Sequence, residues 1–363
     1  MQVKASRTVC AMVALGLVLS ACGGGDDGGE RSGGTGEPEA SMTFAGPGGE
    51  LGDVFKASIA DFTAATGVQV TYVEGRVGDN FAKVQAGNQS GNQEIDVLLS
   101  NDSVDPIGRG QGLFQPLDPQ LVPNIEKLAE KARRADGVGV LVMFTLVGLI
   151  YNEAELAARN LPAPTSWTDL WNPMYDCVII ADPSGGNGLK GFVAMNFVAS
   201  GGDLYDIDAT IEKLKAMGSH IVGIEGASEQ VINDVSAGRG CLSVSNQGRA
   251  LAAIDGGAPV EFILPEEGTS YIENPLQLVT GANSPVAGQL LINWLLDTPT
   301  QQELYETQAF TPMNTDVEPV TTGIAAAVTT ADQLDTLNLM EADMATAPVD
   351  EWLRKFQSEV AQQ

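Results

Sequence analysis

Four short polar loops carry the residues of this chain whose types suit ligand chemistry. Each follows a short apolar run and precedes a segment of helical spacing; they are Gly46–Gly49, Ser100–Ser103, Pro183–Gly188 and Ser245–Arg249. Backbone N–H groups at the start of a helix point outward and favour the oxygens of a ligand. In open α/β sheets, ligands bind beyond the carboxyl ends of the strands, where such loops lie. Glycines and small polar residues are also ordinary helix caps, so both roles stay open for each residue.

Within these loops we take the glycines and polar side chains as candidate ligand-binding residues. They are Gly48, Gly49, Asn101, Asp102, Ser184, Asn187, Asn246, Gln247 and Arg249. Arg249 suits a carboxylate or phosphonate, because its planar guanidinium donates several hydrogen bonds at once. A surface ion pair is the alternative role for Arg249.

Residues that most catalytic sites need are scarce. The single histidine, His220, lies in an apolar run that predicts a buried strand. One histidine excludes most histidine-based zinc sites and would leave a Ser-His-Asp triad dependent on this residue. The motifs G-x-S-x-G, G-x-x-x-x-G-K-[ST] and H-E-x-x-H do not occur. We expect a binding protein with no catalytic residues, metal or cofactor; an exported enzyme that uses two carboxylates is the alternative.

The charge balance argues against a nucleic-acid partner. Lys and Arg total 19 against 47 Asp and Glu, which gives a formal net charge of −28 at pH 7. Such a surface repels phosphates, and no basic cluster offsets it. An acidic surface can raise the local concentration of cationic solutes or simply keep the protein soluble.

The N-terminus has the layout of an export signal. Lys4 and Arg7 precede an apolar run, Cys10–Leu19, that is too short to span a bilayer. The sequence LSAC that ends at Cys22 resembles the lipobox of bacterial lipoproteins. This resemblance implies a signal peptide over residues 1–21, lipidation of Cys22, and a protein anchored in the periplasm or at the cell surface. An ordinary signal peptide with an incidental Cys22 is the alternative.

Residues 22–41 are rich in glycine and acidic residues and lack apolar periodicity, so they predict a flexible tether. Export places Cys177 and Cys241 in an oxidising compartment. Each cysteine opens an apolar run, and parallel neighbouring strands would bring the two to matching ends. A disulfide and two buried thiols are both compatible with this pattern.

Apolar spacing predicts alternating strands and helices in two successive sets. The expected strands include residues 42–45, 68–73, 94–100, 177–181, 220–224, 242–245 and 260–264. The expected helices include residues 50–66, 80–87, 124–134, 208–217, 228–236 and 350–360. Residues 138–152 predict two extended pieces. This order implies parallel pairing with helices outside the sheets, and therefore an α/β protein with two lobes.

Eight stretches, in order, resemble the type II periplasmic solute-binding proteins of ABC importers, in the branch that includes spermidine/putrescine-binding proteins. They are FTAATGVQV, EIDVLLSND, GLFQPLD, LIYNEAEL, PTSWTDLWNP, VEFILPEEG, NSPVAGQLLINWLL and FTPMN, and they cover nearly all of residues 42–316. The resemblance implies two lobes, each a parallel-rich sheet flanked by helices, with a hinge and a cleft between them. It implies capture of a small solute by hinge closure, delivery to ABC permease subunits, and a monomer.

The resemblance also implies lobe boundaries. Lobe 1 would combine residues 42–145 with 275–363, and lobe 2 would span residues 146–274. The hinge crossings would lie near residues 144–152 and 265–277.

A polyamine or related amine is the solute that the resemblance favours, held by aromatic rings and carboxylates. Tyr271 and Glu273 could supply one ring and one acid, and Asp102 a further carboxylate. The family's cage is incomplete, because the AGPGG loop has neither Trp nor Glu and Asn246 stands where a Trp is expected. A small anion or zwitterion, such as a carboxylate or phosphonate, is the first alternative. Ferric iron is another, although the six tyrosines show no neighbouring pair of the kind that branch uses.

Overall fold

The computed structural model describes residues 37–362 apart from 324–325, 327, 335 and 345. The predicted signal peptide, the predicted lipidation site Cys22 and most of the predicted tether at 22–41 lie outside the described residues. Of the helices that are described, none is both long enough and apolar enough to cross a bilayer.

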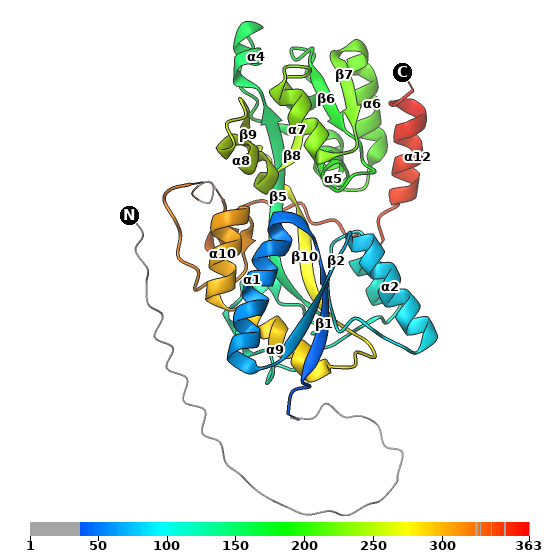
Figure 1. The fold of residues 1–363 in the computed structure, drawn as a ribbon. Helices are drawn as coiled ribbons and strands as arrows, with labels where there is room; N and C mark the ends of the chain where they lie inside the picture. Colours follow the sequence, from blue (N-terminus) through cyan, green and yellow to red (C-terminus); the bar gives the residue numbers. More distant parts are fainter. Residues whose placement is uncertain (1–36, 324–325, 327, 335, 345, 363) are drawn as a thin grey trace, which may run out of the picture. The chain divides into compact units, whose positions relative to one another are not determined.

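One mixed sheet runs through the described chain in the strand order β2-β1-β3-β10-β5-β8-β6-β7 (Figure 1). Its strands are β1 (Ser41–Gly46), β2 (Gln69–Glu74), β3 (Val97–Leu99), β5 (Val140–Tyr151), β6 (Val178–Ala181), β7 (Ile221–Glu225), β8 (Leu242–Asn246) and β10 (Ser270–Val279). The short strands β4 (Phe114–Gln115), β9 (Glu261–Ile263) and β11 (Thr311–Pro312) pair beside this path. β1, β2 and β3 are parallel, as are β6, β7 and β8. The antiparallel strands β5 and β10 join the two parallel sets.

Helices connect and flank these strands. They are α1 (Gly49–Thr66), α2 (Val77–Ser90), α3 (Asp105–Gly110), α4 (Glu153–Ala158), α5 (Gly186–Ser200), α6 (Ile207–Met217), α7 (Ser228–Ser236), α8 (Gln247–Asp255), α9 (Pro285–Leu295), α10 (Thr298–Gln308), α11 (Ala331–Leu334) and α12 (Val349–Glu359). Single 3-10 turns are η1 (Pro123–Lys127), η2 (Glu130–Ala132), η3 (Trp167–Trp171) and η4 (Gly218–His220). In α1 the spacing of Val54, Phe55, Ile59 and Phe62 buries one face, and Gly67 ends the helix with a φ of 81°.

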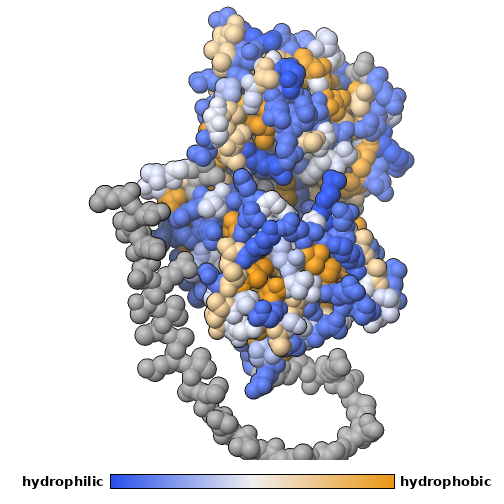
Figure 2. All heavy atoms as spheres, viewed as in Figure 1, coloured by the Kyte–Doolittle hydropathy of each residue, from blue (hydrophilic) through white to orange (hydrophobic). Residues whose placement is uncertain are grey.

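Two large apolar cores define two lobes. The core that contains Phe44, Phe55 and Leu291 belongs to what we call lobe 1, and the core that contains Trp167 and Phe192 to lobe 2. Strand β5 contributes to both, because Leu146 packs in the first core and Val147 in the second. Figure 2 shows that one face of the molecule is mostly hydrophilic over both lobes, in keeping with the acidic composition.

Three local predictions differ from the structure. The two extended pieces expected in residues 138–152 form one twelve-residue strand, β5, which is buried throughout because it pairs with other strands along its length. The helix expected over 124–134 is replaced by η1 and η2. Arg133 Nε donates to the Leu128 carbonyl at 2.9 Å, and Asn124 bonds to the distant Asn293 of α9. One local and one long-range side-chain contact thus take the place of a helical ladder.

His220 is the third difference. It ends η4 and is half-buried, instead of lying within a buried strand. The strand that follows, β7, forms the end of the sheet and leaves Val222 exposed. The apolar composition of β7 is typical of a core strand. β7 is nevertheless partly exposed, because an edge strand has a partner strand on one side only.

The C-terminal segment corrects the predicted lobe boundary. The sequence places residues 275–363 in lobe 1, whereas Met340, Trp352 and Phe356 are buried in the core of lobe 2. Trp352 and Phe356 lie four residues apart on one face of α12, which packs against α6 (Figure 1). The chain therefore passes between the lobes a third time. At this crossing, Met340 N donates to the Thr269 carbonyl at 2.8 Å.

Cys177 and Cys241 are joined by a disulfide, with Cα atoms 5.3 Å apart. Strands β6 and β8 pair in parallel with Val178 opposite Leu242, so the cysteines lie at matching strand ends. The structure therefore has the parallel arrangement that brings the two cysteines together, and of the two thiol states left open by the sequence it has the disulfide.

Candidate solute-binding site

Strand β10 separates two cavities. Ile272 and Asn274 line a cavity of about 540 Å³, which we call the cleft cavity. Tyr271 and Glu273 line another of about 380 Å³, which we call the rear cavity. The division follows from strand geometry, because successive side chains of a strand point to opposite faces of the sheet.

The cleft cavity collects residues that follow the parallel strands of both lobes. It is lined by Gly48, Glu50, Leu51, Asn101, Thr145, Gly186, Asn187, Ser228, Asn246, Gly248, Arg249, Ala252, Ile272, Asn274, Thr307, Gln308 and Phe310. Five of these are residues that the sequence singled out: Gly48, Asn101, Asn187, Asn246 and Arg249. Gly48 and Asn101 come from lobe 1, and the other three from lobe 2. The volume of the cleft cavity lies within the range of ordinary small-molecule pockets.

Four helices begin at this cavity, namely α1, α5, α7 and α8. No side chain caps the N-terminus of α1, α5 or α7, whereas the Asn246 side chain caps α8 by accepting from Arg249 N at 2.9 Å. The first N–H groups of a helix have no partner within the helix, and the helix dipole makes that end positive. A side chain at Gly188 would collide with the Asp182 carbonyl, so glycine lets α5 start this close to β6.

A chain of amide hydrogen bonds fixes the lobe 2 wall of the cleft cavity. Asn246 Nδ2 donates to Asn187 Oδ1 at 2.9 Å, and Asn187 Nδ2 donates to Ser228 Oγ at 2.7 Å. These three residues stand at the starts of α8, α5 and α7. Asn187 and Asn246 are each only 6% exposed. The bonds therefore hold three helix starts in fixed relation around one space.

The cleft cavity has little charge of its own. Glu50 and Arg249 are the ionisable residues among those that line it, and both are exposed. Arg249 pairs with Glu229, and its side chain keeps 53% of its surface exposed. The helix starts place partial positive charges at this cavity, and the exposed Arg249 also lines it.

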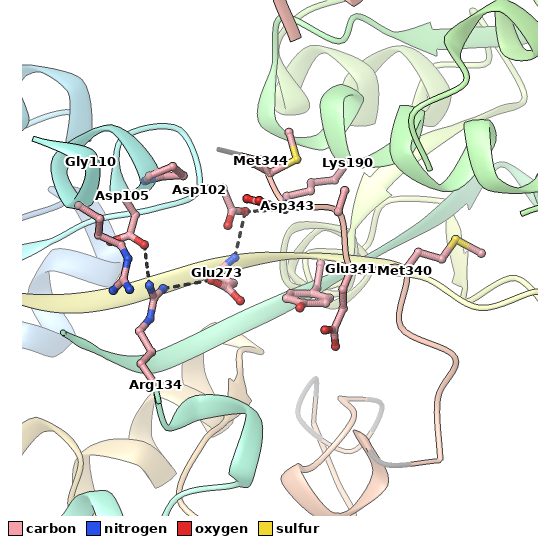
Figure 3. Close-up of a pocket in the computed structure, with 14 residues that line it drawn as sticks. Asp102, Asp105, Gly110, Arg134, Lys190, Glu273, Met340, Glu341, Asp343 and Met344 are labelled. Atoms are coloured by element: carbon pink, nitrogen blue, oxygen red, sulfur yellow. Dashed lines mark hydrogen bonds and ion pairs between the residues drawn. The ribbon is translucent and has the colours of Figure 1, made fainter. Parts of the chain in front are cut away.

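The rear cavity is highly charged, and several of its opposite charges pair with one another (Figure 3). Lys190 Nζ lies 3.2 Å from Asp102 Oδ2, which also accepts from Glu273 N at 3.1 Å. Arg134 binds Asp105 at 2.8 Å and Glu273 at 3.2 Å. Lys190 Nζ also lies 5.7 Å from the centre of the Tyr271 ring. Asp102, Glu273 and Tyr271 are the residues that the sequence suggested as partners for an amine. In the structure, Lys190 or Arg134 already lies beside each of them.

Burial raises the pKa of Asp102, and the Lys190 ammonium offsets part of that rise. Burial also raises the pKa of Glu273, with the nearby Asp102 carboxylate adding to the effect. Burial is also the main cause of the raised pKa of the Tyr271 phenol, and the nearby Glu273 carboxylate adds to it. Desolvation is the main cause in all three.

Sequence reasoning missed Lys190, Arg134 and Asp105. Lys190 begins the second turn of α5, three residues after the candidate Asn187, and helical spacing places it near that loop. Asp105 follows the predicted loop 100–103 at the start of α3. Arg134 follows η2 in a segment expected to be helical, and no local signal points to it.

Three candidate residues line neither cavity. Gly49 opens α1 with a φ of 67°, Ser184 N donates to Asp182 Oδ1 at 2.8 Å within a turn, and Gln247 is buried in the first turn of α8. The structure gives these residues roles in shaping the loops. Within the residues described, no cluster of three or more His, Cys, Asp or Glu side chains is arranged to hold a metal ion.

Comparison with known proteins agrees with this architecture. Residues 57–334 match the family described as bacterial extracellular solute-binding protein. The chain belongs to this family. The spermidine/putrescine-binding periplasmic protein of Salmonella typhimurium is 23% identical over 263 residues, which cover 70% of this chain and 73% of the relative.

Two solved structures show the same fold for this solute-binding protein. An ABC transporter structure from Clostridium perfringens is similar with a TM-score of 0.75 at 20% identity, covering 88% of this chain and 99% of the other. A spermidine/putrescine ABC transporter substrate-binding protein from Streptococcus pneumoniae gives a TM-score of 0.70 at 16% identity, covering 89% and 98%. The expected two-lobed periplasmic-binding-protein fold is confirmed.

Proposed function

We propose that this solute-binding protein captures a small organic anion or zwitterion in the cleft cavity. The observation that carries the proposal is the meeting of four helix starts at one cavity, three of them without a side-chain cap. Such N–H groups suit carboxylate, phosphonate or phosphate oxygens. Arg249 adds a cationic donor at the edge, and Glu50 offers a partner for an amine if the solute is a zwitterion.

A polyamine is the second candidate, and the name of the Salmonella relative supports it. Each ammonium of a diamine needs an anionic or strongly accepting partner when it is buried. The cleft cavity offers one carboxylate, Glu50, and one aromatic ring, Phe310. Asp102 and Glu273 lie on the other face of β10, paired with Lys190 and Arg134. This distribution makes a polyamine the weaker fit.

Capture would proceed by closure of the lobes about β5 and β10, within the hinge crossings predicted near residues 144–152 and 265–277. Gly48 and Asn101 would hold the solute from lobe 1, while Asn187 and Asn246 hold it from lobe 2. A solute that touches both walls binds the closed form better and so shifts the balance toward it. We further propose that the protein acts as a monomer, without enzymatic turnover, and delivers its solute to ABC permease subunits. It would be exported and anchored by a lipid on Cys22, with residues 22–41 as tether.

A thermal-shift screen tests the solute class. The panel is γ-aminobutyrate, succinate, phosphonoacetate, glucose 6-phosphate, putrescine and spermidine, each added to the purified protein. A solute at a hundred times its Kd stabilises the folded protein by about 2.7 kcal/mol, which is readily measured as a rise in Tm. We expect a rise with at least one anion or zwitterion and none with the two polyamines. NMR of the recovered solute should show it unchanged.

Arg249→Gln should weaken binding of the responding solute about tenfold, because one charge-assisted contact at an exposed edge is lost. Lys213→Gln is the matched control, since Lys213 is exposed on α6 and lines neither cavity. A rise in Tm with putrescine or spermidine alone would overturn the anion proposal in favour of the second candidate. Chemical conversion of the solute would instead identify an enzyme.

A further inference from the structure

An ion pair links the two lobes on the face of β10 that is opposite the cleft. Lys190 belongs to α5, whose Phe192 and Val193 are buried in the lobe 2 core. Asp102 follows β3, whose Val97 and Leu99 are buried in the lobe 1 core. Side-chain exposure is 9% for Lys190 and 15% for Asp102, so solvent screens this pair much less than a surface pair.

Both partners are closely connected to the solute site. Asp102 follows Asn101, which lines the cleft cavity, and Lys190 lies one helical turn after Asn187, which lines the opposite wall. The Lys190 carbonyl accepts from Ser270 Oγ at 2.6 Å, which ties this turn of α5 to the first residue of β10. Movement of either cleft wall therefore carries one member of the ion pair with it.

We propose that the Lys190–Asp102 pair is a rear latch that opposes closure of the cleft and so sets the affinity for solute. Strands β5 and β10 run between the lobes, with the cleft cavity on one face of β10 and the ion pair on the other. A rotation about these strands that narrows the cleft widens the rear face. The latch has to stretch for the cleft to close, and part of the binding energy of the solute is used to open it. Lys190 and Asp102 are positioning residues in this scheme, because neither lines the cleft cavity.

Neighbouring contacts strengthen the lobe 1 side of the latch. Asp102 is held by the Glu273 backbone N–H, and Glu273 is held by Arg134, which is in turn fixed by Asp105. Lys190 has one ion-pair partner in the described structure, Asp102, and the face of the Tyr271 ring nearby. The bond between Lys190 and Asp102 is therefore the contact of this network that reaches lobe 2.

The inference rests on the lobe closure of the proposed function but not on the charge of the solute. Its test compares wild type with Lys190→Met, Asp102→Asn and the double variant. Isothermal titration uses whichever compound of the panel above raises Tm, and small-angle X-ray scattering is recorded without any solute. We expect each single variant to bind about tenfold more tightly, with the double variant no tighter than the singles, because all three lose one shared contact. Scattering should shift toward shorter interlobe distances.

The two single variants separate a latch from a simple charge effect. Lys190→Met removes a positive charge and would weaken binding of an anion through the field alone, whereas Asp102→Asn would strengthen it. A latch predicts tighter binding in both cases. Lys215→Met is the matched control, since it breaks the 2.8 Å pair with Glu359 between two helices that pack on the lobe 2 core.

Equal or weaker binding in Lys190→Met would overturn the latch, as would opposite effects in the two single variants. If no panel compound binds, scattering decides: unchanged curves for both folded single variants overturn it. Wild-type scattering that contracts with a panel compound while the variants behave like wild type would preserve hinge closure and reject the latch alone.

Discussion

The two faces of β10 differ in how their polar groups are used. On the rear face, eight Asp, Glu, Lys or Arg side chains line one cavity: Asp102, Asp105, Arg109, Arg134, Lys190, Glu273, Glu341 and Asp343. On the cleft face, two line a larger cavity, and amides, hydroxyls and helix starts supply the remaining polarity. Opposite charges at the rear bind one another, whereas three of the four helices that start at the cleft have no side-chain cap. Under the proposed function, helix starts without side-chain caps mark the ligand site, and the density of charge in a cavity does not.

If the rear face apart from the Lys190–Asp102 pair is structural, damage there should lower the free energy of unfolding and spare solute affinity. Trp352→Ala tests this most severely, because Trp352 is fully buried and anchors α12, which follows the segment Met340–Met344 that walls the rear cavity. The unfolding free energy should fall by about 4 kcal/mol, measured by urea unfolding, with solute affinity changed less than about threefold.

Trp352→Phe is the control for this variant. The indole Nε1 has no hydrogen-bond partner in the described structure, so phenylalanine keeps most of the packing and loses no bond. A smaller loss than in the alanine variant is expected. A large loss of affinity in Trp352→Ala, with stability retained, would contradict the division between the faces.

The corresponding change in the cleft should reduce solute affinity and leave the free energy of unfolding largely unchanged. Asn246→Asp keeps the cap on α8 but places a negative charge at the meeting point of three helix starts. Affinity for an anionic or zwitterionic solute should fall by about 3 kcal/mol, or about a hundredfold, measured by isothermal titration. Asn246→Ser, which can also cap the helix, is the neutral control. Tighter binding of a polyamine to Asn246→Asp would instead support the second candidate.

The smallest expected effect is a pH dependence on the rear face. The pKa of Glu273 is raised above its usual value, and the groups that act on it are Asp102, Arg134, Lys190 and Asp105. The folded protein therefore holds this proton more tightly than the unfolded chain. The stability that this provides is complete below the usual Glu pKa and is lost as pH rises through the raised value.

Glu273→Gln cannot ionise, so it should escape that loss. Arg134 keeps its bond to Asp105 in this variant. Urea unfolding between pH 4 and pH 7 should show no difference from wild type at the acidic end. At neutral pH the variant should be more stable by about 1 kcal/mol or less. A variant that is less stable than wild type at pH 7 would show that the ion pair with Arg134 outweighs burial.

Much of this architecture could be predicted from the sequence because it depends on local periodicity. Alternating strands and helices and the loops that start α1, α5 and α8 follow from spacing and turn residues. Family resemblance added the hinge and the cleft between the two lobes.

What failed to be predicted depends on long-range partners. Alternation shows that Tyr271 and Glu273 share one face of the sheet. Which of the two faces they occupy is set by pairing of β10 with β5 and β3, which are distant in sequence. Lys190 looked like an ordinary helix residue because its partner Asp102 lies 88 positions earlier, in the other lobe. The amphipathic pattern of α12 predicted a buried face without saying which lobe would cover it.

The alternation in β10 also constrains how this protein can vary. Ile272 and Asn274 can change without touching the rear face, and Tyr271 and Glu273 without touching the cleft. A single-residue insertion just before Tyr271 is different, because a register slip of one residue moves every side chain to the other face. Charged groups would then enter the cleft and apolar groups would meet the rear ion pairs. We therefore expect β10 to tolerate substitutions but not an insertion of one residue. An insertion of two residues should return its side chains to their original faces.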